Sequence, residues 1–279
     1  MRHAATFLFV PGDRPDRFAK ALAAGADCVI IDLEDAVQRE AKAEARQAIL
    51  AADINWSQVA VRINDANSPD FEADRQFLRA CATPTIILPK AESPHNVAQI
   101  RAACARDVDV ITMIETARGL ANMAALLSAP GVRRAAFGHL DFALDLGSSA
   151  DWDSLLFIRS QMVLQSRLAG ALAPIDSVTT DYKNAEAAAA DAAAARRLGF
   201  GGKFLVHPNQ IAPVTLAFKP TASEIAWAEG VIAACKGKHG AVALDGKKVT
   251  AGADPRRAGA AGAASHRSRN GERCSHGNH

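Results

Sequence analysis

The 279-residue sequence has few aromatic residues, few cysteines and no long apolar run. Aromatic residues make up 5% of the chain and the formal net charge is +2, so nothing suggests a basic groove for nucleic acid. The five cysteines are scattered and lack a C-x-x-C spacing, which argues against a disulfide framework and a zinc knuckle. No apolar run approaches the ~20 residues of a membrane span, and no signal-type segment is recognised. We therefore expect a soluble, cytoplasmic protein that binds neither nucleic acid nor membranes.

Short apolar segments rich in Val, Ile and Phe alternate with longer segments of helical periodicity. This alternation is typical of βα units around a parallel sheet, and single-domain α/β barrels commonly have about 250 residues. Eight segments qualify as strands, which favours a closed (β/α)₈ TIM barrel with a short C-terminal appendage. The predicted strands are 6–10, 28–33, 58–63, 85–88, 110–114, 135–138, 173–178 and 203–206.

Composition divides the chain into three parts. The βα pattern predicts a catalytic barrel over residues 1–218, followed by a helical or lid segment over 219–250. Residues 251–279 are rich in Gly, Ala, Arg, Ser and His and have no helical or strand periodicity. We expect this tail to be disordered, because it has almost no large apolar side chain to bury.

Capping residues predict where several helices begin and end. Asp13 is expected to cap a helix that has Pro15 in its first turn. An alanine-rich helix is expected over 186–198, ended by Gly199. A further helix over 220–236 lies outside the eight βα repeats.

Two carboxylates follow neighbouring predicted strands. Glu115 comes directly after the run 110–114, and Asp141 follows the run at 135–138. Carboxyl ends of neighbouring parallel strands lie at the same end of a barrel, so these two side chains are expected to converge. Such a pair of oxygen ligands suits Mg²⁺. The alternative is that both merely cap the following helices or pair with Arg118; we favour the metal site.

Arg62 and three acidic residues form a second group of candidates. Arg62 ends an apolar strand and is either a buried ion-pair partner or a bidentate clamp for a substrate carboxylate; we favour the clamp. Asp32, Glu34 and Asp35 follow the second strand. Because side chains alternate along a strand, all three are not expected to point inward, and at least one should support a neighbour or pair with Lys or Arg. We favour Glu34 and Asp35 as catalytic residues together with Arg62.

Further polar residues at strand ends carry weaker predictions. Arg14 and the amides after Gly12 lie where a helix is expected to begin, which is a natural anion site; the alternative is a surface arginine. Lys90 is either a Schiff-base nucleophile or a point charge in a carboxylate-lined site, and we favour the point charge. His207 is interpreted as structural rather than as a base, and His139 is left unassigned.

Six co-linear segments together resemble the citrate lyase β-subunit family. This family belongs to the HpcH/HpaI aldolase group of Mg²⁺-dependent enzymes, which includes malyl-CoA and citramalyl-CoA lyases. The resemblance extends from about residue 6 to residue 248. The segments are 8–15, 31–37, 61–64, 88–93, 113–119 and 206–211.

The resemblance implies a (β/α)₈ barrel assembled as a homotrimer or hexamer. It implies that Glu115 and Asp141 hold Mg²⁺ and that Arg62 binds the substrate carboxylate. Arg14, Lys90 and Glu115 are expected to share substrate binding with Arg62. The implied partner is a thioester of coenzyme A or of an acyl-carrier group, lying over the barrel mouth.

The implied reaction is reversible cleavage of a carbon–carbon bond in a 3-hydroxyacyl thioester. The products would be an acetyl-type thioester and a 2-oxo acid, as with citryl-, malyl- or citramalyl-CoA. Two alternatives remain: a metal-dependent aldolase acting on a free 2-oxo-4-hydroxy acid, and a non-catalytic subunit that binds ligand without turnover.

The C-terminal part departs from the family pattern. Thr250 stands where many members have an Asp that serves as acid or base, and a threonine hydroxyl does not titrate near neutrality. One hypothesis is a reading-frame shift, since residues 250–259 read one base later in G/C-rich codons resemble the family helix; an intact frame on resequencing would refute it. Leu140, where relatives often place Glu before the metal ligand, leaves the subfamily open.

Overall fold

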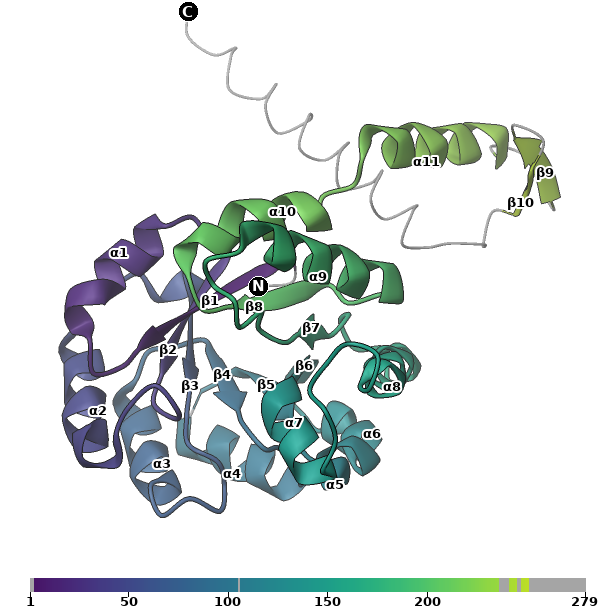
Figure 1. The fold of residues 1–279 in the computed structure, drawn as a ribbon. Coiled ribbons are helices and arrows are strands. Elements are labelled where there is room, and N and C mark those ends of the chain that lie inside the picture. Colours follow the sequence, from purple (N-terminus) through teal and green to yellow (C-terminus); the bar gives the residue numbers. More distant parts are fainter. Residues whose placement is uncertain (1–2, 105, 236–240, 245–246, 251–279) are drawn as a thin grey trace, which may run out of the picture. The chain divides into compact units, whose positions relative to one another are not determined.

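A computed structural model describes residues 3–104, 106–235, 241–244 and 247–250 (Figure 1). The backbone divides into two compact units, with the boundary between Phe218 and Lys219. Within the described ranges, no helix is both long enough and apolar enough to cross a bilayer.

The first unit is a closed barrel of eight parallel strands in sequence order, with β1 paired to β8. The sequence-based prediction of a TIM barrel is therefore confirmed. Seven strands agree with the predicted ones to within three residues at each end, while β7 keeps only two residues of the expected 173–178. The strands are β1 (Thr6–Pro11), β2 (Cys28–Asp32), β3 (Val59–Arg62), β4 (Thr85–Leu88), β5 (Asp109–Ile114), β6 (Val132–Phe137), β7 (Ile175–Asp176) and β8 (Gly202–Leu205).

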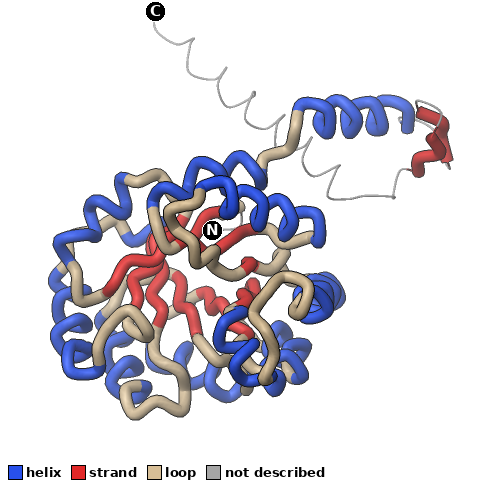
Figure 2. Tube along the Cα trace, in the orientation of Figure 1, coloured by secondary structure: helices blue, strands red, loops and turns tan. Residues whose placement is uncertain are grey.

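Helices surround the ring of strands on the outside (Figure 2). Short 3₁₀ turns, labelled η, precede or follow several of them. The helical elements of the barrel unit are η1 (Pro15–Arg17), α1 (Phe18–Ala23), η2 (Arg39–Ala41), α2 (Lys42–Ala51), η3 (Trp56–Gln58), α3 (Phe71–Ala80), α4 (Pro94–Cys104), α5 (Ala117–Ala121), α6 (Met123–Ser128), α7 (His139–Leu146), α8 (Leu156–Leu168), α9 (Ala185–Leu198), η4 (Pro208–Gln210) and α10 (Ile211–Phe218).

Apolar side chains form two separate clusters because they alternate along each strand. One set, including Phe7, Ile30, Met113 and Phe204, fills the barrel interior. The other set, including Leu8, packs between the strands and the surrounding helices. Since the interior is filled, polar side chains gather where the strands end, as is usual for this fold.

The helix start expected at Asp13 is wrong. The chain first forms the 3₁₀ turn η1, and α1 begins only at Phe18. Arg14 occupies the position before η1 and gives no side-chain cap, because a guanidinium has no acceptor for the free amides. Its guanidinium instead donates to Asp16 at 2.8 and 2.9 Å. The backbone amides of Gly12 and Arg14 donate to the carbonyls of Asp32 and Pro11 at 2.8 and 3.1 Å.

The alanine-rich helix α9 agrees with the sequence-based prediction. Asn184 caps its start by accepting a hydrogen bond from the Ala187 amide at 3.0 Å. Gly199 ends it with φ +112°, a left-handed conformation that glycine adopts at little cost.

The second unit contains one helix and two strands among the described residues. Helix α11 (Ala222–Cys235) begins with a capping box, in which Glu224 N donates to Thr221 Oγ1 and Thr221 N donates to Glu224 Oε2. Strands β9 (Ala241–Leu244) and β10 (Lys247–Thr250) pair antiparallel. The helix was predicted from sequence and the strand pair was not; the expected disordered tail lies outside the described residues.

Candidate active site

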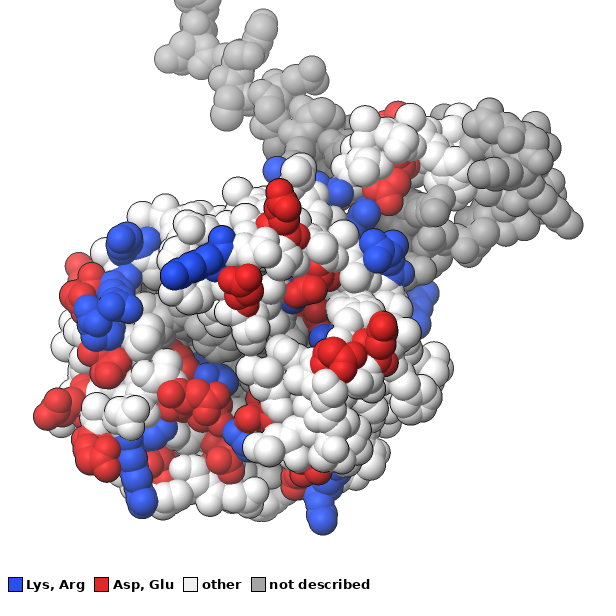
Figure 3. All heavy atoms as spheres, viewed as in Figure 1, with Lys and Arg blue, Asp and Glu red and all other residues white. Residues whose placement is uncertain are grey.

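A cavity of about 310 Å³ opens where the barrel strands end. Acidic and basic side chains are interspersed on the face of the molecule seen in Figure 3. The lining combines a few charged groups with an apolar wall, as is usual for small-molecule sites. It consists of Phe9, Asp32, Asp35, Ala36, Arg62, Met113, Glu115, Gly138, His139, Leu140, Asp141, Ser177, Val178, Phe204 and Val206.

Glu115 lies directly after β5 and is almost fully buried, with 3% of its surface exposed. Its Oε2 accepts a hydrogen bond from the Lys90 amide at 2.7 Å. Gly138, at the end of β6, lies so close that a Cβ there would overlap the Glu115 carboxylate. Burial, reinforced by the charge of Glu34, raises the pKa of Glu115.

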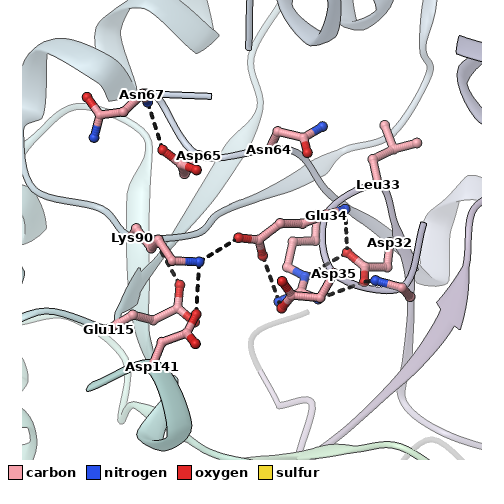
Figure 4. Close-up of polar contacts among 12 residues, drawn as sticks. Asp32, Leu33, Glu34, Asp35, Asn64, Asp65, Asn67, Lys90, Glu115 and Asp141 are labelled. Carbon is pink, nitrogen blue, oxygen red and sulfur yellow. Dashed lines mark hydrogen bonds and ion pairs between the residues drawn. The ribbon is translucent and has the colours of Figure 1, made fainter. Parts of the chain in front are cut away.

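Lys90 links the carboxylates that the sequence predicted to converge. Its Nζ lies 2.8 Å from Asp141 Oδ2 and 2.9 Å from Glu34 Oε1 (Figure 4). Asp141 is in the first turn of α7. The Glu115 carboxylate contacts the backbone amide of the same lysine, Lys90. Burial opposes the charge on Lys90, but the hydrogen bonds to Asp141 and Glu34 raise its pKa overall. The structure thus brings Glu115 and Asp141 together around one residue.

Arg62 is held in place by three carboxylates. Arg62 and Asp32 are register partners at the ends of β3 and β2, and the guanidinium binds both Asp32 oxygens at 2.6 Å. Arg62 Nη1 lies 2.9 Å from Glu34 Oε2 and 3.2 Å from Asp35 Oδ2. In this structure Arg62 is therefore a buried ion-pair partner, one of the two roles expected from the sequence. Although burial opposes ionisation, the Arg62 charge lowers the pKa of Asp32.

At least one of these three acids was expected to pair with Lys or Arg, and all three contact Arg62. Strand β2 ends at Asp32, and the chain turns immediately afterwards, so the strand rule no longer governs Glu34 and Asp35. Lys42 fixes this turn by donating to the carbonyls of Leu33 and Glu34 at 2.7 and 2.9 Å. Burial is the main cause of the raised pKa of Glu34.

Several site residues were not found by sequence reasoning. The Phe9 ring lies 4.8 Å from the Arg62 guanidinium carbon, a cation–π distance. Ser177 Oγ accepts a hydrogen bond from the His139 amide at 3.1 Å and also contacts the ring Nδ1. Burial lowers the pKa of His139 to about 4, so this ring is neutral at pH 7. Phe9 and Ser177 both fall inside predicted strands, 6–10 and 173–178, where nothing distinguishes them from residues that only form the strand.

Other predicted residues lie outside the cavity lining. Arg14 is 44% exposed and pairs with Asp16. The His207 ring stacks near Tyr182 at 5.3 Å and accepts from the Asn209 amide, which agrees with a structural role. Thr250 lies in β10, and its side chain is outside the described part of the structure.

Few side chains at this site could bind a metal ion, and those that could would bind it through carboxylate oxygens. Among the described residues, no group of three or more His, Cys, Asp or Glu is arranged to hold a metal ion. Mg²⁺ commonly binds through one or two carboxylates and takes its remaining ligands from water and substrate. The buried Glu115 carboxylate, seated against Gly138 and close to Asp141, fits that pattern.

Comparisons of this chain with a family model and with related proteins point to the same family. Residues 5–208 match the family model described as HpcH/HpaI aldolase/citrate lyase. A citrate lyase subunit beta-like protein of Mycobacterium tuberculosis is 36% identical over 250 residues, covering 87% of this chain and 89% of the relative. The mitochondrial citramalyl-CoA lyase of Rattus norvegicus is 32% identical over 255 residues, covering 82% and 75%.

A solved structure gives the same result. The M. tuberculosis CitE protein, in complex with magnesium, acetoacetate and coenzyme A, superposes with a TM-score of 0.81 at 34% identity, covering 98% of this chain and 100% of that one. The fold, the family model and these relatives agree, and the chain belongs to the HpcH/HpaI aldolase/citrate lyase family.

Proposed function

We propose that this protein is a Mg²⁺-dependent carbon–carbon lyase that cleaves a 3-hydroxyacyl thioester to an acetyl-type thioester and a 2-oxo acid. The observation that carries the proposal is the juxtaposition, at one barrel mouth, of the Glu115 and Asp141 carboxylates with the Arg62 guanidinium. Relatives named as citramalyl-CoA lyase and citrate lyase beta-like protein, and a solved relative in complex with magnesium and coenzyme A, support this reaction class.

Glu115 and Asp141 are the proposed Mg²⁺ ligands. When bound, the ion would act as a Lewis acid toward the substrate oxygens. Lys90 and Gly138 hold Glu115 in position, the first through its amide and the second by leaving space for the carboxylate. Because Glu115 is buried and partly protonated at neutral pH, it must be deprotonated to serve as a ligand.

Arg62 is the proposed binding group for the substrate carboxylate. Asp32 grips Nε and Nη2 and so fixes the plane of the guanidinium, while Nη1 is shared between Glu34 and Asp35. A substrate carboxylate would replace the exposed Asp35, whose side chain is 65% accessible. The bidentate contact with Asp32 needs the planar guanidinium of arginine and cannot be made by lysine.

Glu34 and Asp35 are the proposed proton-transfer groups, since Thr250 offers no carboxylate. Glu34 is buried between Arg62 and Lys90, and its pKa is raised toward neutrality, where a general base is most effective. Asp35 lines the cavity directly. Arg14 is proposed to contact an anionic part of the thioester, which requires it to leave Asp16.

We further propose that the protein works in the cytoplasm as a homotrimer or hexamer. Cys28, Cys81 and Cys104 are free and buried, which agrees with a reducing compartment. Size measurement in solution by light scattering tests the assembly: a mass near 29.3 kDa would contradict it.

The test of the reaction is release of 2-oxo acid from citryl-, malyl- and citramalyl-CoA, measured with Mg²⁺ and again with chelator. Metal-dependent release from one thioester supports the proposal and identifies the substrate. Activity on a free 2-oxo-4-hydroxy acid, without thermal stabilisation by coenzyme A, would favour the aldolase alternative. Binding of Mg²⁺ and oxaloacetate without turnover of any thioester would favour a non-catalytic subunit.

A further inference from the structure

We propose that Lys90 is a resident cation of the metal site: its ammonium group holds the site together in the metal-free protein and is displaced from Asp141 when Mg²⁺ binds. The inference rests on the metal assignment in the proposed function. It gives Lys90 a role distinct from substrate binding, since the residue then sets how tightly the metal is held.

Lys90 contacts three carboxylates near the proposed metal position, those of Glu34, Glu115 and Asp141. Nζ lies 2.8 Å from Asp141 Oδ2 and 2.9 Å from Glu34 Oε1, while the backbone amide donates to Glu115 Oε2 at 2.7 Å. Figure 4 shows the ammonium between Glu34 on one side and Asp141 on the other. Among the described residues, Lys90 is the cation in contact with Asp141. A single residue therefore supplies positive charge where the dication is proposed to bind.

The backbone at Lys90 points to a role for the side chain. Among the described residues, Lys90 is the one non-glycine with a positive φ, +44°. A left-handed conformation is unfavourable for a non-glycine residue, and glycine would aim the same amide at Glu115 without that cost. The amide contact thus explains the turn but not the lysine. The two carboxylates bound by Nζ do explain it.

Lys90 is also free to move, in contrast to the other cation of the site. Arg62 is 8% exposed and held by two 2.6 Å contacts to the buried Asp32, so it cannot leave without stranding a buried charge. Lys90 is 32% exposed, and its partner Asp141 is 34% exposed. Its flexible stem can carry the ammonium into water while the backbone amide stays on Glu115.

Lys90 Nζ occupies Asp141 Oδ2, and an ammonium group and Mg²⁺ repel each other when both lie against one carboxylate. In this proposal the ion therefore takes the place of the ammonium on Asp141. This competition weakens metal binding in the wild-type protein. A lysine that merely oriented the carboxylates without leaving would have the opposite effect, because its removal would loosen the ligands. The two roles therefore predict opposite changes in Mg²⁺ affinity.

The experiment is a calorimetric titration of the chelator-treated full-length protein with MgCl₂, comparing wild type with Lys90→Gly and Lys90→Met. Lys90→Gly suits the left-handed backbone and keeps the amide, so it carries the test if Lys90→Met fails to fold. Lys20→Met on the exposed face of α1 is the control for the change in net charge. We expect Mg²⁺ to bind Lys90→Gly and Lys90→Met about two- to fivefold more tightly, the upper part of the range given by loss of one partly exposed ion pair.

A second readout is the rise in the unfolding midpoint produced by a fixed Mg²⁺ concentration, which should be larger in both Lys90 variants than in wild type and Lys20→Met. Unchanged or weaker Mg²⁺ binding in the Lys90 variants, with normal binding by wild type, would overturn the proposal and leave the proposed function standing. Absence of Mg²⁺ binding by the wild-type protein would overturn the metal assignment itself, and this inference with it.

Discussion

Gly138 and Glu115 are packed so closely that a Cβ at Gly138 would lie 2.8 Å from Glu115 Cδ. Their strands are neighbours, and the Gly138 amide donates to the carbonyl of Ile114 at 3.1 Å. The missing side chain at the end of β6 thus creates the space in which the Glu115 carboxylate lies.

We expect Gly138→Ala to remove Mg²⁺ binding while the barrel still folds, because the new methyl group forces the Glu115 carboxylate out of position. Misplacement of a reacting group by about 1 Å costs on the order of a hundredfold in rate. Lyase rate and Mg²⁺ affinity should fall together. Gly147→Ala is the control, since Gly147, unlike Gly138, has open space where its Cβ would lie, and its φ of +69° adds backbone strain away from the site. Normal Mg²⁺ affinity in Gly138→Ala would contradict the argument.

Substitution of Arg62 should affect both stability and ligand binding, and a double variant separates the two. Arg62→Met leaves Asp32, which is 1% exposed, without its partner, and breaking a buried pair in this way costs about 3–5 kcal/mol. Adding Asp32→Leu removes the stranded charge and should recover most of the free energy of unfolding, measured in denaturant. Oxaloacetate binding should stay lost in the double variant. If it returned, Arg62 would be only a structural ion-pair partner.

The stability of the metal-free protein should fall as pH rises. Burial raises the pKa of Glu34 to about 7 and that of Glu115 to about 8, above their unfolded value of 4.5. Between the unfolded pKa of 4.5 and these raised pKa values, the folded state binds more protons than the unfolded state. The free energy of unfolding therefore decreases from about pH 5 to pH 8. Thermal midpoints in chelator test this trend. Glu115→Gln should flatten the profile between pH 7 and 8, and a profile that rises with pH would contradict the burial argument.

Removal of either proposed metal ligand should abolish turnover. Glu115→Gln and Asp141→Asn keep the size of each side chain but lose the charge, and we expect rates to fall on the order of a hundred- to a thousandfold. Asp145→Asn on the same helix as Asp141 is the matched control, because Asp145 accepts a hydrogen bond from the Ala117 amide instead. A loss in Asp145→Asn comparable to that in Asp141→Asn would indicate damage to α7 and not loss of a ligand.

The sequence predicted the parts of the site that follow from strand ends. Four site residues were identified because each lies at or just after the end of an apolar run: Arg62, Lys90, Glu115 and Asp141. The carboxyl ends of parallel barrel strands lie at the same end of the barrel, so these side chains were expected to meet. The strand ends were located to within a few residues for the same reason. Only β7 was much shorter than predicted.

The remaining details depend on geometry that periodicity does not encode. The turn after Asp32, which brings Glu34 to Arg62, is fixed by Lys42, a residue ten positions along the chain. The left-handed backbone at Lys90 is unusual for a lysine, so no propensity rule predicts it. The pairing of His139 with Ser177 joins the first residue of α7 to the segment just after β7, 38 residues further along the chain.

The most direct test of the account is anomalous diffraction from crystals of the wild-type protein grown with Mn²⁺, as a substitute for Mg²⁺, and oxaloacetate. We expect one ion at the barrel mouth bound by carboxylate oxygens of Glu115 and Asp141 at about 2.0–2.3 Å, with the oxaloacetate carboxylate on Arg62 and the Lys90 ammonium away from Asp141. An ion bound elsewhere, or oxaloacetate bound at the mouth without an ion on these two carboxylates, would contradict the account.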